Sequence, residues 1–91
     1  MAISRQQLLT TLGLDGATLE LWLEQQWLIP EQAAVEKQFS ARDVARARLV
    51  MDLKGDMGVN DEGVDVILRL LDQLHGLRRA LATLHHELND V

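Results

Sequence analysis

Cysteine is absent from this 91-residue sequence, so neither a disulfide nor a cysteine-ligated zinc ion can stabilise its fold. Proline occurs once, tyrosine not at all, and aromatic residues make up only 3% of the chain. No apolar run approaches the roughly 20 residues that span a bilayer, and the first residues lack the basic and then apolar profile of a signal peptide. We therefore expect a cytoplasmic protein that contacts no membrane.

Acidic residues outnumber basic ones, 14 to 9, which gives a formal net charge of −5. Such a balance argues against a protein that functions by neutralising phosphates, and it favours a basic partner. Hydrophobic residues account for 47% of the chain, but a chain of this length buries only about 60–65% of its unfolded surface. A second copy or another partner would add to its stability.

The first 30 residues predict two helices joined by a tight turn. Ser4 and Gln7 form a capping-box pattern before a short helix that Gly13 ends. The Asp15-Gly16 corner then begins a second helix, which we expect Pro30 to stop. Its apolar face has the spacing i, i+3, i+4 and i+8 and comprises Leu19, Trp22, Leu23 and Trp27. This order of elements is the outline of a helix-turn-helix unit.

The stretch from Glu31 to Phe39 is polar and carries β-compatible residues at intervals, namely Ile29, Val35 and Phe39. It predicts a small β wing or an irregular loop. Ser40 and Asp43 then give a second capping pattern, and the apolar spacing after them predicts a third helix up to Gly55.

The last helix is expected to begin at Asn60 and to run to about Asn89. Its apolar residues fill the a and d positions of three heptads: Ile67, Leu70, Leu74, Leu77, Leu81, Leu84 and Leu88. The module before it is too small to cover this seam along its whole length, so we expect the outer half, from about Leu77, to pack on a second copy. The e and g positions carry too few opposed charges to specify parallel or antiparallel pairing.

Catalytic and metal-binding patterns are missing from the sequence. Ser4 and Ser40 are explained as helix caps. His75, His85 and His86 do not have the i, i+4 spacing of a metal pair, and no phosphate-binding glycine loop or zinc-protease motif occurs. The acidic residues from Asp56 onward lack the spacing of a calcium loop. We expect neither an enzyme nor a cofactor.

Charge is distributed unevenly along the chain. No lysine or arginine lies between Arg5 and Lys37, whereas this stretch holds Asp15, Glu20, Glu24, Glu31 and Glu36. In a DNA-binding helix-turn-helix the second helix enters the major groove and needs cationic and hydrogen-bonding side chains. Here that helix offers Glu20 and Glu24, which disfavours DNA binding through this element.

The order of elements and several short segments resemble the winged helix-turn-helix of the MerR superfamily, in particular its small chaperone-modulator branch, the CbpM family. The segments that carry the resemblance are Leu14 to Leu19, Trp27 to Pro30, Phe39 to Val44, and Asp56 to Leu74. DNA-binding MerR proteins have an Arg-x-Tyr-Tyr-Glu-like signature on the second helix. This chain has Leu19-Glu20-Leu21-Trp22-Leu23-Glu24 instead, without the arginine or the tyrosines.

The resemblance implies a dimeric inhibitor that binds the J-domain of a co-chaperone of the CbpA type and prevents it from stimulating the Hsp70 DnaK. A J-domain presents a basic helix to Hsp70, and an acidic surface could cover it. We expect Glu20, Glu24 and Glu31 to supply the charge and Leu21 or Trp22 to anchor the contact, although the spacing of both tryptophans also suits the core. A second acidic cluster could serve equally well and comprises Asp56, Asp61, Glu62 and Asp65.

Two other functions remain open at this point. A MerR-like transcriptional regulator would hold DNA through the wing or through Arg42, Arg46 and Arg48. A small acidic inhibitor, such as an antitoxin, would mask another basic protein surface. In each case we expect a mainly α-helical chain in which residues 1–58 form the winged helix-turn-helix module. Residues 59–91 form a helix that packs on this module and on a second copy, within one structural domain.

Overall fold

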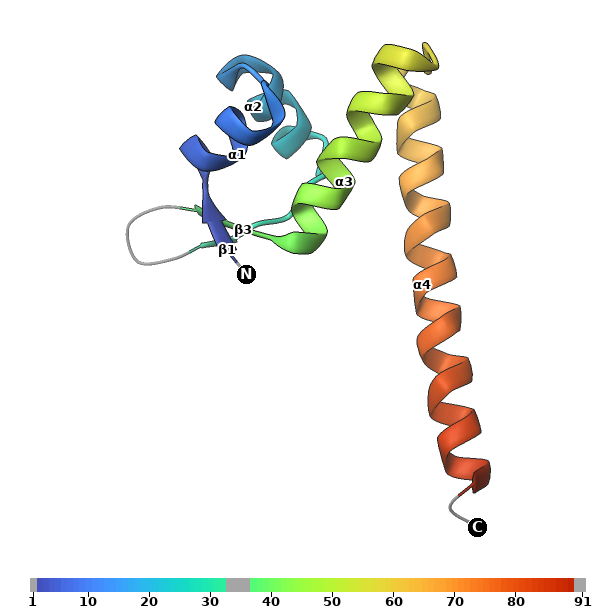
Figure 1. Cartoon of the computed structure of the whole chain (residues 1–91). Helices are drawn as coiled ribbons and strands as arrows, with labels where there is room; N and C mark the ends of the chain where they lie inside the picture. Colours follow the sequence, from blue (N-terminus) through green and yellow to red (C-terminus); the bar gives the residue numbers. More distant parts are fainter. Residues whose placement is uncertain (1, 33–36, 90–91) are drawn as a thin grey trace. The chain divides into compact units, whose positions relative to one another are not determined.

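A computed structural model describes residues 2–32 and 37–89 (Figure 1). The chain divides into two compact units, residues 1–59 and residues 60–91. The first unit holds three helices, a π-helical turn and a small sheet, and the second is one long helix. The architecture confirms the predicted mainly helical fold with a small β element and a long C-terminal helix.

Helix α1 (Arg5–Leu12) begins with the predicted capping box. The Ser4 hydroxyl accepts the Gln7 backbone N–H at 3.2 Å, and the Gln7 amide oxygen accepts the Ser4 N–H at 2.8 Å. At the other end Gly13 takes a φ of 68°, a left-handed conformation that glycine adopts without a steric penalty. The turn leads directly to Asp15, which caps helix α2 (Gly16–Glu24).

Helix α2 ends at Glu24, so the prediction that it continues to Pro30 is wrong. Gln26 adopts a φ of 62°, and two hydrogen bonds close the helix, from the Gln26 N–H to the Leu23 carbonyl and from the Trp27 N–H to the Trp22 carbonyl. This is a Schellman turn, with its usual apolar contact supplied by Trp22 and Trp27, whose ring centroids lie 6.5 Å apart. Trp27 is therefore a core residue beyond the helix and not part of its face.

The sheet has three antiparallel strands in the order β1-β3-β2. They are β1 (Ala2–Ser4), β2 (Glu31–Gln32) and β3 (Lys37–Ser40). Ile3 pairs with Phe39, and Glu31 pairs with Gln38. Strands β2 and β3 are the predicted wing, whereas β1 was not predicted. The expected contribution of Val35 lies outside the described residues.

Helix α3 (Ala41–Met51) begins with the second predicted capping box, in which Ser40 and Asp43 bond reciprocally. The α-helix does not continue to Gly55 as predicted, because the chain widens at Asp52 into the π-helical turn η1 (Asp52–Asp56). A bond from the Met57 N–H to the Asp52 carbonyl closes this turn, and Gly58 follows with a φ of 65°.

Every element of the first unit except β1 and β2 contributes to its buried core. The buried apolar side chains of this unit are Leu8, Leu19, Trp22, Trp27, Leu28, Phe39, Ala47, Val50 and Leu53. Trp22 and Trp27 are 4% and 2% exposed, which confirms that both tryptophans belong to the core.

The second unit is helix α4 (Asp61–Asn89), whose bounds match the prediction. The side chain of Asn60 caps it by accepting the Gly63 N–H at 2.8 Å. Asp61 and Glu62 stand in the first turn, where the positive end of the helix dipole stabilises carboxylates. Val64 and Leu68 are its buried residues, and neither belongs to the predicted leucine seam.

Candidate functional site

The outer face of α2 combines acidic and apolar side chains. Glu20, Leu21 and Glu24 are exposed, while the opposite face of the same helix places Leu19 and Trp22 in the core. Leu21 is 59% exposed, so it places a large apolar side chain on the solvent-facing side of this helix. The helix contains no lysine or arginine. Its outer face is therefore anionic, with an accessible apolar side chain beside the carboxylates.

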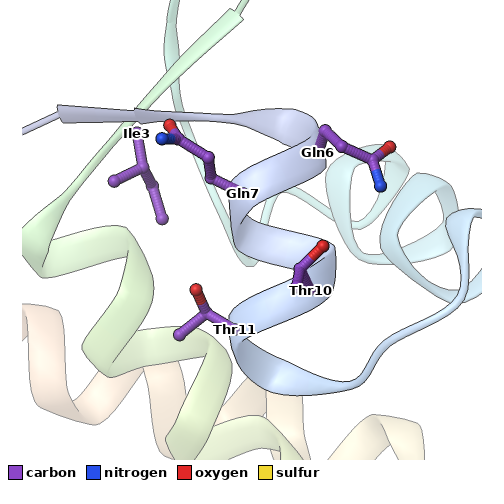
Figure 2. Close-up of a pocket in the computed structure, with 5 residues that line it drawn as sticks. All are labelled: Ile3, Gln6, Gln7, Thr10 and Thr11. Atoms are coloured by element: carbon purple, nitrogen blue, oxygen red, sulfur yellow. The ribbon is translucent and has the colours of Figure 1, made fainter.

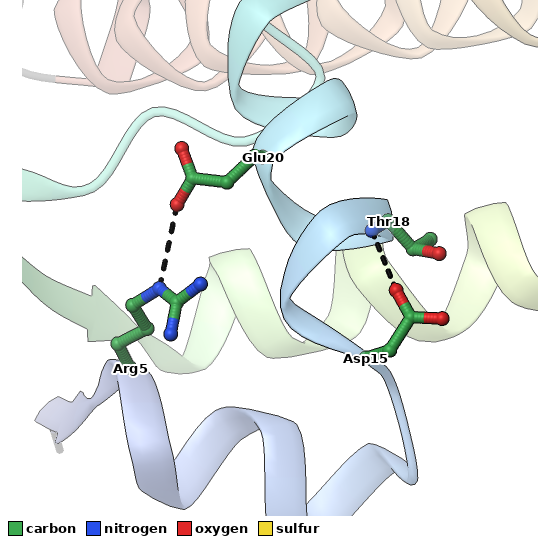
Figure 3. Close-up of polar contacts among 4 residues, drawn as sticks. All are labelled: Arg5, Asp15, Thr18 and Glu20. Atoms are coloured by element: carbon green, nitrogen blue, oxygen red, sulfur yellow. Dashed lines mark hydrogen bonds and ion pairs between the residues drawn. The ribbon is translucent and has the colours of Figure 1, made fainter.

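One of these carboxylates has a cationic partner on the neighbouring helix. The Arg5 Nε lies 3.4 Å from the Glu20 Oε1, so the ion pair joins the start of α1 to the middle of α2 (Figure 3). The guanidinium also covers the first turn of α2, because a Cβ built on Gly16 would lie 2.7 Å from the Arg5 Nη2. Arg5 therefore compensates one carboxylate of the acidic stretch, although the sequence showed no base within that stretch. Sequence spacing gave no signal for this pair, since 15 residues separate its members.

The Asp15 side chain is engaged in a local hydrogen bond. Its Oδ1 accepts the backbone N–H of Thr18 at 2.7 Å, and this hydrogen bond lowers the pKa of the Asp15 carboxyl below its ordinary value (Figure 3). The carboxylate acts as the N-cap of α2. This capping role accounts for one of the five acidic residues between Arg5 and Lys37, so Asp15 needs no partner protein to explain its presence.

Glu31, the third carboxylate expected at the site, lies on the edge strand β2 and is exposed. Among the described residues no hydrogen bond or ion pair joins it to α2. Glu36 lies outside the described residues. The structure thus places Glu20, Leu21 and Glu24 on one helix face and Glu31 on a separate element of the same unit.

The second acidic cluster is divided between the two units. Asp56 ends the turn η1 in the first unit, whereas Asp61, Glu62 and Asp65 belong to α4. Within α4, Asp65 pairs with Arg69, with 2.9 Å between the Oδ2 and Nη2 atoms. Asp61 and Glu62 fulfil the role of first-turn acids. Asp61, Glu62 and Asp65 therefore each have a local structural role within α4.

The predicted seam of α4 is a continuous row of exposed leucines. Their exposed fractions are 57% for Leu70, 40% for Leu74, 64% for Leu77, 64% for Leu81, 51% for Leu84 and 66% for Leu88. Monomeric proteins seldom expose apolar side chains in such a contiguous row, and rows of this kind mark protein interfaces.

The cations that a DNA-binding function would use are only partly available. The Arg46 Nε donates to the Trp27 carbonyl at 2.8 Å, which fixes the loop after α2 to α3. Arg42 is exposed and takes part in another interaction. Arg48 is exposed beside an open hollow of about 340 Å³, which is lined by Thr11, Leu12, Arg48, Met51 and Asp52.

A second hollow, of about 300 Å³, lies along the outer side of α1 and has an uncharged lining of Ile3, Gln6, Gln7, Thr10 and Thr11 (Figure 2). It offers amide and hydroxyl groups but no nucleophile paired with a base. The part of the chain that the structure describes contains no group of three or more potential metal ligands. Within the same residues no helix is long and apolar enough to cross a membrane.

Two helices joined by a tight glycine turn, followed by a small antiparallel sheet and a third helix, define a winged helix-turn-helix protein. The chain matches the model of the MerR HTH family regulatory proteins over residues 3–86, and it belongs to this family. It is thus a regulatory protein of a class that acts by binding and not by catalysis. No curated protein and no solved structure matched the chain.

Proposed function

We propose that this protein is a cytoplasmic chaperone modulator of the CbpM type. It binds the J-domain of a CbpA-type co-chaperone and thereby inhibits the stimulation of the Hsp70 DnaK. The segments that resemble the CbpM family support this function, and membership of the MerR family is consistent with it.

The observation that carries the proposal is the outer face of α2. This helix holds the position of the recognition helix in a DNA-binding relative, yet its exposed side chains are Ala17, Glu20, Leu21 and Glu24, with no cation among them. Carboxylates facing a phosphate backbone repel it, whereas the same carboxylates attract the basic helix of a J-domain. The protein therefore has the helix-turn-helix fold, but the acidic exposed face of α2 suits binding to a basic protein.

Leu21 provides the apolar contact at the centre of this face, in the manner of the buried anchors that dominate many interfaces. Glu24 supplies a second carboxylate, while Glu20 exchanges its contact with Arg5 for a cation of the partner. Glu31 on β2 is the remaining candidate for the rim of the contact. The acidic residues Asp56, Asp61, Glu62 and Asp65 form the alternative surface for the same partner.

The protein forms a homodimer in this proposal, and the leucine seam of α4 is its interface. Six leucines at the a and d positions are 40–66% exposed, and a second copy of the same helix supplies an equivalent row. A dimer carries two copies of the α2 face.

DNA binding is the second candidate function, and membership of a family of HTH regulators favours it. The cations of α3 would then contact phosphates, with Arg42 and Arg48 as the exposed members. The acidic face of α2 opposes this function, because it occupies the position at which base edges are contacted.

Isothermal titration against a CbpA-type J-domain, at low and at physiological salt, tests the proposal. A random-sequence DNA duplex serves as the parallel titrant. We expect binding to the J-domain that weakens with salt, and no binding to the duplex. Binding to the duplex alone would favour the regulator, whereas binding to neither would leave an acidic module that masks another basic protein. The variant Glu20→Lys with Glu24→Lys should abolish J-domain binding, while Asp61→Lys with Glu62→Lys tests the alternative surface.

A further inference from the structure

Helix α4 carries a second stripe of side chains that the proposed function does not use. Successive residues of an α-helix are turned by about 100°, so positions three, four and seven residues apart share a face. Between residues 75 and 89 one such face, roughly 120° wide, holds His75, Arg78, Arg79, Ala82, His85, His86 and Asn89. All seven are exposed. The leucine seam lies beside this stripe and shares no residue with it.

The same face has a different character in the first half of the helix. Between residues 61 and 72 it holds the exposed Asp61 at one edge, and otherwise Val64, Ile67, Leu68 and Leu71, of which Val64 and Leu68 are buried and the other two half-buried. From His75 onward the side chains on this face are polar or cationic, and Ala82 is the exception. The face is therefore mainly apolar up to Leu71 and mainly polar or cationic from His75 onward.

Charge is also separated along the helix. Four of the five charged residues of positions 61–72 are acidic, whereas positions 75–89 hold Arg78, Arg79 and one acidic residue, Glu87, which lies outside the stripe. In a chain with a net charge of −5, the two adjacent arginines of the stripe are a local reversal of sign. No ion pair engages Arg78 or Arg79 within the described residues. The His85 Nε2 lies 3.1 Å from the Asn89 Nδ2, a contact within the stripe.

We infer that this cationic stripe is a second interaction surface, which binds an acidic helical segment of a partner protein. Arginine forms bidentate hydrogen bonds with carboxylates, and acidic side chains at i, i+3 and i+7 of a partner helix match the spacing of the stripe. The small side chain of Ala82, at its centre, lets the axis of a second helix approach closely. The stripe is about 21 Å long, enough for four turns of such a helix.

Phosphate chemistry fits the stripe less well than carboxylates do. Two arginines release few counterions, about two per site, and the remaining chain repels a polyanion. We therefore do not expect nucleic acid to be the ligand, and the test below includes a DNA duplex as a competing titrant.

The test uses the full-length, uniformly ¹⁵N-labelled protein and a synthetic helical peptide of alanine and glutamate with glutamates at i, i+3 and i+7. Binding should shift the amide resonances of residues 75–89, and the affinity should fall at least tenfold in the variant Arg78→Glu with Arg79→Glu. The matched variant Arg48→Glu with Arg69→Glu has the same net charge but leaves the stripe intact, so its affinity should change less than twofold. Both pairs are exposed, and circular dichroism checks that each variant folds.

Three results would overturn the inference. The peptide could fail to bind, its affinity could fall equally in both double variants, or a random-sequence duplex could shift residues 75–89 more strongly than the peptide does. None of these results bears on J-domain binding, which the proposed function assigns to the outer face of α2.

Discussion

Arg5 and Glu20 connect the two helices of the helix-turn-helix, with 3.4 Å between the Nε and Oε1 atoms. Their side chains are 41% and 55% exposed, so water and salt screen the pair and its contribution to stability is small. Its larger consequence is for the surface, since it neutralises one of the carboxylates on the outer face of α2. The charge that a partner meets at Glu20 therefore depends on Arg5.

Replacing Arg5 by glutamine should strengthen J-domain binding. Glu20 loses its internal partner, and because exposed ion pairs are worth less than about 1 kcal/mol, the affinity gain is at most about fivefold at low salt. The free energy of unfolding should fall by less than about 1 kcal/mol for the same reason. Titration calorimetry and urea denaturation measure the two effects. Weaker binding at unchanged stability would show that Arg5 itself contacts the partner.

The capping box of α3 should matter more to stability than that of α1. The Ser40 hydroxyl accepts the Asp43 N–H at 3.2 Å and lies 3.1 Å from the Asp43 Oδ2, and Asp43 is only 6% exposed. Ser40→Ala removes the cap and one partner of a buried carboxylate, so it should cost about 1–2 kcal/mol. Ser4→Ala, at an exposed cap, should cost about 0.5–1 kcal/mol. Equal losses in urea denaturation would contradict this ranking.

Asp15 should give the protein a pH-dependent increment of stability. Its pKa is lower in the folded chain than the ordinary 3.8, because the Thr18 N–H stabilises the carboxylate. The stabilisation is therefore fully present above the unfolded pKa and is lost as the pH falls through the folded value. Asp15→Asn keeps a capping oxygen without the charge. The melting temperature of wild type should exceed that of the variant at neutral pH, and the difference should vanish in acid; a difference independent of pH would contradict this cause.

The leucine seam should determine the oligomeric state. Wild type should have twice the chain mass of 10.2 kDa in light scattering, and Leu77→Asp with Leu84→Asp should give the mass of one chain, since two carboxylates per helix cannot be buried in the seam. The control His75→Asp with Ala82→Asp has the same seven-residue spacing outside the seam and should remain dimeric. A dimer in the seam variant would place the interface elsewhere.

Much of this architecture could be predicted from local patterns. Both capping boxes, the glycine turn and the bounds of α4 follow from interactions between residues three or four positions apart. The early end of α2 did not follow, because Gln26 takes the left-handed position that a pattern assigns to glycine. Strand β1 and the π-helical turn also escaped prediction, since β1 depends on pairing with Phe39 far along the chain and η1 has no local signature.

The candidate site was predictable in composition but not in geometry. The sequence indicates that α2 is acidic and that Trp22 suits the core, because periodicity assigns the two faces of a helix. It gives no sign that Arg5 reaches Glu20 or that Arg46 is held by the Trp27 carbonyl, since both contacts depend on the tertiary fold.

The most direct test of the central claim is the rate of ATP hydrolysis by DnaK, stimulated by a CbpA-type co-chaperone, as this protein is added. The proposed function predicts that stimulation falls to the basal rate as the protein saturates the J-domain. Leu21→Asp with Glu24→Lys, on the exposed face of α2, should leave the stimulation intact, whereas the control Arg48→Glu should inhibit as wild type does. Undiminished stimulation at saturating wild-type protein would contradict the chaperone-modulator function.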